Sequence, residues 1–228
     1  MTNPTGQISA PIQMRPDSEQ RIPMSYEDYL EAVDTRAHAE WVNGEAIIFM
    51  PPSTRHQQII GFLYRLIAEF VDLLQLGTVL IAPFEMKVSP TSNAREPDML
   101  FVATAHLPRL TRQRLAGPAD LVVEVISPES LHRDRADKFF EYQQAGVREY
   151  WLIDPRDGQQ QVAVYALNAA GQYQPIAADA EGRIASTVLA GFWLRPAWLW
   201  QEPLPAPLPV LMQLPTVAEA LRAALDAQ

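Results

Sequence analysis

Cysteine is absent from the 228-residue sequence, and histidine occurs only 4 times. The first absence excludes disulfide bonds, thiolate metal sites and cysteine nucleophiles. A metal site would therefore depend on the oxygen atoms of Asp and Glu, which suit Mg²⁺ or Mn²⁺ rather than zinc. The lack of cysteine is also compatible with the reducing cytoplasm, where we expect the protein to act.

Basic residues are scarce as well. The chain has 18 Lys and Arg against 27 Asp and Glu, which gives a formal net charge of -9 and an isoelectric point near 4.9. Non-specific binding to nucleic acid depends on clustered Lys and Arg. The composition therefore argues against a protein that coats nucleic acid, but it allows an enzyme that contacts nucleic acid locally through a metal ion.

Long apolar segments are missing. No apolar run reaches the ~20 residues that a transmembrane helix requires, and residues 1–20 lack the apolar core of a signal peptide. We therefore expect no contact with a membrane. Residues 1–22 are rich in Pro, Gln, Ser and Thr and are predicted to form a disordered tail.

The most informative stretch that is present begins at residue 118 and ends at residue 151. Residues 121–126 hold five aliphatic side chains and one carboxylate, Glu124, which is typical of a strand covered on both faces. A loop, a helix that carries Lys138 and a second strand over residues 149–154 follow. An isolated carboxylate in such a strand costs several kcal/mol. Glu124 therefore needs a cation opposite it.

Two upstream elements are well marked. Asn43-Gly44 separates two apolar segments and predicts a β-hairpin. Apolar residues at helical spacing predict a helix over residues 54–74. Thr54 and Gln57 have the spacing of a capping box at its start, and Gly77 is the expected C-terminal cap.

The other segments complete a mixed α/β domain. Strands are predicted over residues 78–88 and 97–102, and an antiparallel meander follows residue 154. The meander strands are expected at residues 161–165, 172–176 and 184–188. The core order is therefore helix, strand, strand, strand, helix, strand, preceded by the hairpin. The domain is predicted to span residues 23–202, and a Pro-rich linker and C-terminal helix to occupy residues 203–228.

Three acids stand out by their positions. Asp98 begins one predicted strand, Glu124 lies inside the next, and Glu40 lies in the hairpin. Sequential strands are neighbours about two-thirds of the time, so Asp98 and Glu124 should project to one point. Two nearby carboxylates repel unless a cation intervenes. A Mg²⁺ ion there could polarise a phosphate and acidify water, and the Lys138 ammonium beside it could hold the attacking water.

The ordered motifs resemble a known family. They are Glu40-Trp-Val-Asn-Gly-Glu45, Pro51-Pro-Ser with His56, Glu96-Pro-Asp98, Leu121-Val-Val-Glu-Val-Ile-Ser-Pro128, Asp134-Arg-Ala-Asp-Lys138 with Tyr142, and Ala145-Gly-Val-Arg-Glu-Tyr-Trp-Leu-Ile-Asp-Pro155. Together they are similar to the restriction-endonuclease-like family, a domain-of-unknown-function branch of the PD-(D/E)XK nuclease superfamily. Each motif alone is weak, whereas the ordered set is specific.

The resemblance implies a restriction-endonuclease-like core with a mixed sheet, and a metal-dependent endonuclease that acts on DNA. Asp98 and Glu124 would hold Mg²⁺, with Mn²⁺ as a substitute. Lys138 would orient the attacking water, and Glu40 would complete the catalytic set. Nucleases of this superfamily commonly pair two subunits to cut two strands, so a homodimer is expected.

One position departs from the superfamily pattern, which places lysine two residues after the second acid. That position is Ile126 here. The resembling branch carries its lysine on the following helix, and Lys138 fits this place. If the lysine is instead lost, the chain would be an inactive binding or assembly module on the same fold. A metal-assisted hydrolase of a small phosphate compound is a third possibility.

Ordinary structural roles are open for each candidate. Asp98 could be satisfied by a turn, and Glu40 could be an exposed hairpin acid. Glu124 could pair with an arginine such as Arg148. Lys138 could be a solvated partner of Asp134 at i,i+4 spacing. Two further candidates could also have ordinary structural roles: His56 could be a polar residue of the first helical turn, and Tyr142 a packing residue.

Overall fold

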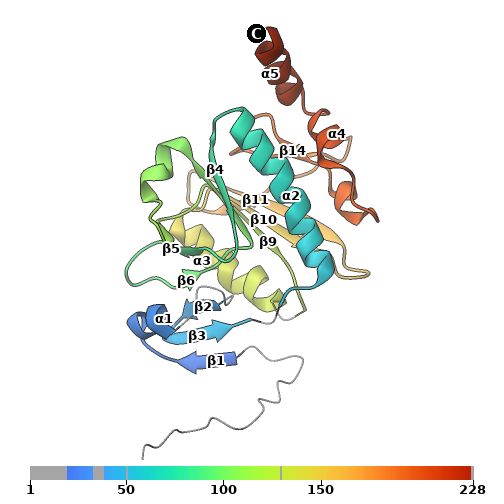
Figure 1. Ribbon diagram of the computed structural model, residues 1–228. Coiled ribbons are helices and arrows are strands. Elements are labelled where there is room, and N and C mark those ends of the chain that lie inside the picture. The colour runs from blue at the N-terminus through green and yellow to red at the C-terminus, as the bar shows by residue number, and fades with distance from the viewer. Residues whose placement is uncertain (1–19, 33–38, 50, 129, 227–228) are drawn as a thin grey trace, which may run out of the picture.

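The computed structural model describes residues 20–32, 39–49, 51–128 and 130–226. Its centre is a mixed six-stranded sheet that contains the strand of Glu124 (Figure 1). β9 runs parallel to β10 and antiparallel to β7, as expected for a restriction-endonuclease-like fold. The strands, in spatial order, are β12 (Tyr173–Pro175), β11 (Gln161–Leu167), β10 (Glu149–Asp154), β9 (Leu121–Val125), β7 (Met99–Ala103) and β4 (Gly77–Ile81).

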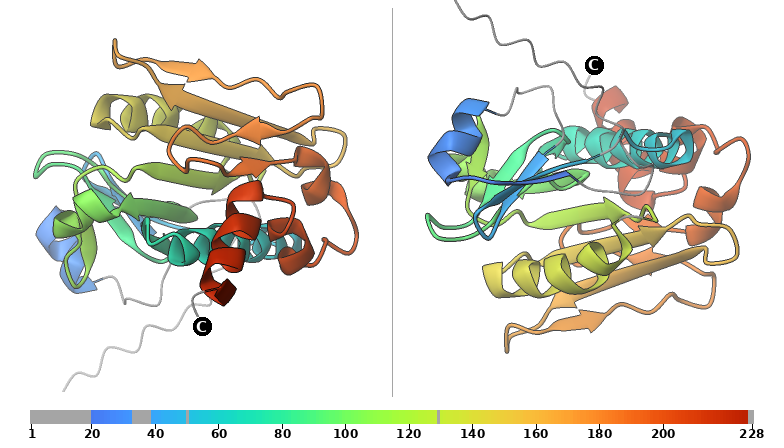
Figure 2. Two further views of the ribbon diagram at one scale, coloured as in Figure 1. Left: turned by 90° about the horizontal axis from the view of Figure 1, so that it is seen from above. Right: turned by 90° about the horizontal axis from the view of Figure 1, so that it is seen from below.

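Two helices cover opposite faces of this sheet, as Figure 2 shows from above and below. Side chains alternate along a strand, so Leu121, Val123 and Val125 pack with α2 (Thr54–Leu73), whereas Val122 packs on the side of α3 (Lys138–Ala145). Glu124 falls on the α3 side by the same alternation. The fully buried strand predicted from composition is confirmed, and it directs its one carboxylate toward the helix that carries Lys138.

A second sheet lies beside the first and supplies Glu40. The predicted hairpin is confirmed, because Asn43 and Gly44 have φ values of 52° and 85° and join two antiparallel strands. The strands, in spatial order, are β1 (Gln20–Pro23), β3 (Glu45–Ile48), β2 (Ala39–Val42), β6 (Ala94–Arg95), β5 (Glu85–Lys87) and β8 (Arg114–Ala116). A short helix, α1 (Tyr26–Ala32), follows β1.

Both predicted caps of α2 are wrong. Ser53 is the N-cap, and its side chain accepts a hydrogen bond from the backbone N–H of His56. At the other end Gln75 takes the left-handed conformation, with φ of 55°. Gly77 instead opens β4, where an added Cβ would lie 2.0 Å from the carbonyl oxygen of Val102. Glycine is required there by the close approach of β7 rather than by the helix end.

Two predicted strands are also corrected. Residues 78–88 do not form one strand, because β4 ends at Ile81 and β5 begins at Glu85 in the other sheet. The meander contains only β10, β11 and β12, since β13 (Ile184–Ala185) pairs with β14 (Trp193–Leu194) in a separate sheet. In the first region, residues 79–84 carry no polar side chain, so the composition does not mark where the chain passes to the other sheet.

The two ends of the chain differ from the predicted boundaries. Residues 20–22 of the predicted tail belong to β1, and residues 1–19 lie outside the described part. The predicted C-terminal helix is confirmed as α5 (Pro215–Asp226), but the Pro-rich segment before it is more than a linker. It contains α4 (Pro207–Leu211), and the two helices place Val210, Leu211 and Val217 in the core beside α2. Within the residues that the structure describes, no helix is long and apolar enough to cross a membrane.

Candidate active site

Glu124 and Lys138 form the centre of the site. Lys138 is the first residue of α3, and its Nζ donates a hydrogen bond to Glu124 Oε1 at 2.8 Å. Tyr142, one turn later, donates its hydroxyl to the same oxygen at 2.8 Å. The strand carboxylate therefore has its cationic partner. The alternative prediction, that Arg148 pairs with Glu124, is wrong, because Arg148 Nη1 lies 3.4 Å from Asp120 Oδ1 instead.

Lys138 contacts two further carboxylates. Its Nζ lies 3.0 Å from Glu40 Oε1 and 3.5 Å from Asp134 Oδ1. Lys138 is 3% exposed, so it is not a solvated lysine. The segment Arg133–Asp137 is π-helical, and such turns are rare and frequent at functional sites. This turn brings Asp134 and Lys138 together inside the protein rather than on a helix surface.

Glu40 is fully buried in β2 and is not an exposed hairpin acid. Its Oε2 accepts a hydrogen bond from Arg95 Nη1 at 2.7 Å, and Arg95 also binds Glu141. Its Oε1 accepts from the backbone N–H of Glu96 at 3.3 Å and contacts Lys138. Both oxygens are therefore held by protein groups, and Glu40 is placed to fix the position of Lys138.

Asp98 lies directly before β7 and is tied to the strand of Glu124. Its Oδ2 accepts a hydrogen bond from the backbone N–H of Val125 at 2.7 Å. The same oxygen lies 3.1 Å from Nε2 of His56, in the first turn of α2. His56 is 7% exposed, so its role exceeds that of a first-turn polar residue. Asp98 and Glu124 are thus brought to one place, as the neighbouring strands predict.

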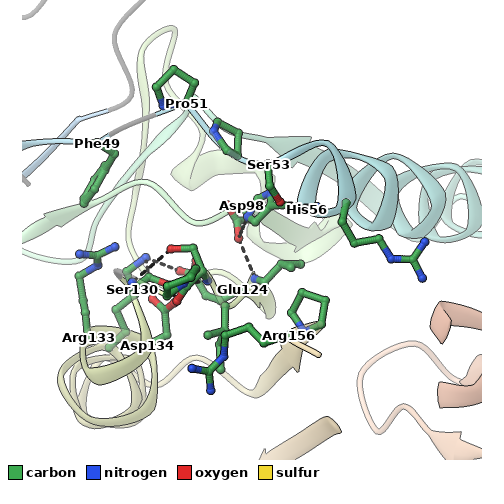
Figure 3. Close-up of a pocket in the computed structure, with 18 of the residues that line it drawn as sticks. Phe49, Pro51, Ser53, His56, Asp98, Glu124, Ser130, Arg133, Asp134 and Arg156 are labelled. Carbon is green, nitrogen blue, oxygen red and sulfur yellow. Dashed lines mark hydrogen bonds and ion pairs between the residues drawn. The ribbon is translucent and has the colours of Figure 1, made fainter. Parts of the chain in front are cut away.

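All of the predicted site residues line one cavity of about 600 Å³ (Figure 3). Asp98 is 8% exposed, Glu124 2% and Lys138 3%, so the reactive groups lie at its floor. Prolines, an aromatic ring and arginines form the walls. These wall residues include Phe49, Pro51, Pro52, Arg55, Pro128, Arg133, Pro155 and Arg156.

A family model named Uma2, with the description "Putative restriction endonuclease", matches residues 26–197, which include all of these acids and Lys138. The chain belongs to the Uma2 family. This match confirms the resemblance seen in the ordered motifs. No curated protein matches the chain.

A solved structure shares the fold of this Uma2 chain. It is the crystal structure of "a putative nuclease belonging to DUF820" from Anabaena variabilis ATCC 29413. The two have a TM-score of 0.63 at 17% sequence identity, and the match covers 78% of this chain and 98% of that chain. At this identity the comparison establishes the restriction-endonuclease-like architecture.

The two acids on neighbouring strands of the Uma2 site differ in protonation. Burial raises the pKa of Glu124 well above its ordinary value, and the charge of Asp98 adds to this effect against the opposing charge of Lys138. Burial alone would also raise the pKa of Asp98, but the hydrogen bond and charge of His56 hold it below the ordinary value. The protein alone therefore favours one proton on the pair, as expected for close carboxylates.

The charges of Glu40 and Lys138 support each other. Burial opposes ionisation of Glu40, yet Lys138 and Arg95 lower its pKa to about 2. Burial would likewise lower the pKa of Lys138, but the carboxylates around it raise that pKa above its ordinary value. Lys138 is therefore an ammonium at neutral pH and can donate hydrogen bonds, but it cannot accept a proton.

The donor atoms fit a hard cation such as Mg²⁺. Within the described residues, Asp98 Oδ1 and Glu124 Oε2 accept no hydrogen bond, and both residues line the cavity. In that same part of the chain, no group of three or more His, Asp or Glu is arranged to hold a metal ion. Mg²⁺ commonly uses only one or two carboxylates and completes its shell with water and substrate phosphates.

Three further residues belong to the site although their local sequence favours ordinary roles. The pattern indicates a surface partner of Lys138 for Asp134, a packing residue for Tyr142 and a polar residue of a first turn for His56. The signal that could have found them is their recurrence in the ordered motifs beside the acids and the lysine. Asp134 Oδ1 is buried without a hydrogen bond in the described residues, which marks it as part of the site rather than of a solvated face.

Proposed function

We propose that this Uma2 chain is a Mg²⁺-dependent phosphodiesterase that cleaves DNA as an endonuclease. One observation carries the proposal. Glu124, buried in a central strand, meets Lys138 at 2.8 Å on the floor of a cavity that Asp98 also lines. Buried acids with perturbed pKa values beside a buried lysine are typical of catalytic sites. The family description "Putative restriction endonuclease" supports a nuclease among the possible reactions.

Asp98 and Glu124 are the residues that would hold the ion. Bound there, Mg²⁺ would polarise a phosphate oxygen and lower the pKa of a water molecule. The backbone N–H of Val125 and the ring of His56 hold Asp98 in place for this role. Their hydrogen bonds occupy Oδ2 and leave Oδ1 for the ion.

Lys138 would orient the attacking water and stabilise negative charge that develops on the phosphate. Its raised pKa keeps it protonated, so its contribution is electrostatic. Glu40 and Asp134 hold the ammonium from two other sides. Mn²⁺ should substitute for Mg²⁺, because both ions take oxygen ligands.

The test is cleavage of plasmid and oligonucleotide DNA with Mg²⁺ or Mn²⁺. Asp98→Ala and Glu124→Ala should each reduce cleavage to the background level. Asp120→Asn is the matched control, because Asp120 is a buried carboxylate that binds His106 away from the cavity. Persistent absence of cleavage by the wild-type protein, or unchanged cleavage by both alanine variants, would sink the proposal.

Hydrolysis of a small phosphate compound is a second candidate. The cavity volume of about 600 Å³ supports it, because sites for small ligands span about 300–1000 Å³. Turnover of generic phosphodiesters, with none on DNA, would favour this reaction. The third hypothesis is an inactive binding module. Calorimetry that detects Mn²⁺ binding through Asp98 and Glu124 would argue against this hypothesis.

The homodimer and the cytoplasmic location stay predictions. Exposed apolar side chains in the C-terminal segment, Leu208, Met212 and Leu225, support self-association. Light scattering at micromolar concentration should give twice the chain mass of 25.6 kDa. A monomeric mass would count against pairing and would leave the cleavage chemistry untouched.

A further inference from the structure

The reactive groups lie too deep for an intact duplex. Asp98, Glu124 and Lys138 line the cavity and are at most 8% exposed, and Figure 3 shows Asp98 and Glu124 there. A rigid duplex carries its phosphates on the outside of a rod whose bases are paired and stacked. A cavity of about 600 Å³ admits a small ligand rather than such a rod. A strand must leave the duplex before its phosphate reaches the floor, as in enzymes that act on unstacked nucleotides.

One wall of the cavity contains an arginine guanidinium group that lies over an aromatic ring. The guanidinium carbon of Arg133 lies 4.4 Å from the centre of the Phe49 ring. Both residues line the cavity, and Phe49 is partly exposed at the end of β3. Aromatic rings and guanidinium planes are the surfaces on which proteins stack unpaired bases.

This pair is also close to the chemistry. Arg133 opens the π-helical turn that holds Asp134, and Lys138 follows that turn directly. A base that stacks beside Arg133 would therefore leave its own phosphate near the floor. Two more arginines line the cavity, and they contact protein groups: Arg156 binds Asp154 at 2.8 Å, and Arg55 binds the carbonyl oxygen of Leu199 at 2.6 Å.

The rest of the wall suits a nucleotide chain without a sequence code. Pro51, Pro52 and Pro155 also line the cavity. Apolar walls favour the faces of bases, whereas readout of base edges would require several polar side chains. The net charge of -9 gives no broad basic surface for a duplex backbone.

We propose that Phe49 and Arg133 form a stacking subsite for one unpaired nucleobase, so that the cavity takes single-stranded or locally unpaired DNA in preference to an intact duplex. The proposal deepens the nuclease function and rests on it for the cleavage step. Binding of the base itself does not require turnover.

The first test compares binding of two DNA forms to the full chain carrying Glu124→Gln, which keeps the size of the side chain but removes the ionisable carboxyl group. The probes are a fluorescent single-stranded oligonucleotide and a blunt duplex of the same sequence, followed by anisotropy. The single strand should bind at least about fivefold more tightly, as expected for even one stacked base. Equal affinity, or tighter binding of the duplex, would overturn the proposal.

The second test isolates the base. Oligothymidylate is compared with an abasic strand of equal length, which keeps the phosphates and removes the bases. Phe49→Ala should weaken oligothymidylate binding by about 5- to 150-fold and leave the abasic strand unchanged. Phe49→Tyr should retain the preference because the ring remains. Equal loss for both strands, or no loss for either, would contradict a stacking role.

Phe140→Ala is the matched control. Phe140 is 58% exposed on α3 but lies outside the cavity, so its loss should leave both affinities unchanged. The binding tests also separate the two proposals. If single strands bind through Phe49 but no DNA is cut, the nuclease function fails and the subsite stands. If intact duplex is cut as fast as single strands, the subsite fails and the nuclease stands.

Discussion

Lys138 Nζ lies 2.8 Å from Glu124 Oε1, although the two residues are 14 positions apart in the chain. β9 supplies the acid, and the turn into α3 returns the lysine to the same face of the sheet. The superfamily pattern achieves this contact from within one strand, at the position occupied here by Ile126. The distance supports the proposal that Lys138 has taken over the role of that lysine.

Replacement of Lys138 by Met should abolish cleavage and destabilise the fold. The change leaves Glu40, Glu124 and Asp134 without their shared counter-charge, and breaking one side of a buried ion pair costs about 3–5 kcal/mol. Urea denaturation at pH 7 measures the loss, which should shrink at lower pH as the carboxyl groups take up protons. Arg112→Met, at an exposed position, should leave both properties unchanged. Wild-type cleavage by Lys138→Met would refute the proposed role.

Asp98→Asn and Glu124→Gln should weaken Mn²⁺ binding by more than about 100-fold, because loss of a ligand should exceed the 10–100-fold cost of losing its supporting partner. The raised pKa of Glu124 means that the metal displaces a proton, so affinity should rise with pH until Glu124 ionises unaided. Calorimetry in two buffers of different ionisation enthalpy measures both effects. Asp120→Asn serves again as the control, and unchanged affinity in the two site variants would remove the metal assignment.

Gly77→Ala should destabilise the protein by roughly 2–4 kcal/mol. Gly77 has φ of 153°, and its added Cβ would meet the backbone of β7 at 2.0 Å. Gly61 in α2 gives the opposite expectation, because nothing lies within 4 Å of its added Cβ. Gly61→Ala should stabilise the helix by about 0.5–1 kcal/mol. Thermal denaturation of the two variants checks the contrast, and equal effects would contradict the close approach.

Much of the site could be predicted because its signals are local. A carboxylate inside an aliphatic strand costs free energy wherever the strand lies. Glu124 therefore predicts a cationic partner before the fold is known. The Asn43-Gly44 turn and the helix after Ser53 can also be predicted from residues that are close together in the sequence. These features placed the strand of Glu124, the hairpin and the body of α2 correctly.

The parts that could not be predicted depend on long-range packing. Asp134 and Lys138 have the spacing of an exposed helix pair, and only the π-helical turn against β9 buries them. Residues 79–84, between most of β4 and the start of β5, carry no polar side chain, so the passage from one sheet to the other leaves no polar signal. Glycine at position 77 serves a neighbouring strand that is distant in sequence. Local patterns contain no information about such neighbours.

Glu96 should make stability fall as pH rises. Burial, reinforced by the charges of Glu40 and Glu85, raises its pKa from 4.5 to about 8. Between these two values the folded protein keeps a proton that the unfolded chain releases. The contribution of Glu96 to the free energy of unfolding is therefore complete below pH 4.5. It is lost as pH rises to about 8, by about 1.4 kcal/mol per pH unit at most.

Glu96→Gln removes this titration while keeping an acceptor for the backbone N–H of Ala39, which Glu96 Oε2 binds at 3.2 Å. The variant should match the wild type near pH 5 and exceed it in unfolding free energy at pH 8. Denaturation curves at half-unit steps of pH measure the difference between the two proteins. Glu69→Gln, on the outer side of α2, should follow the wild-type curve. Parallel curves for Glu96→Gln and the wild type from pH 5 to pH 8 would show that Glu96 is ionised in the folded protein.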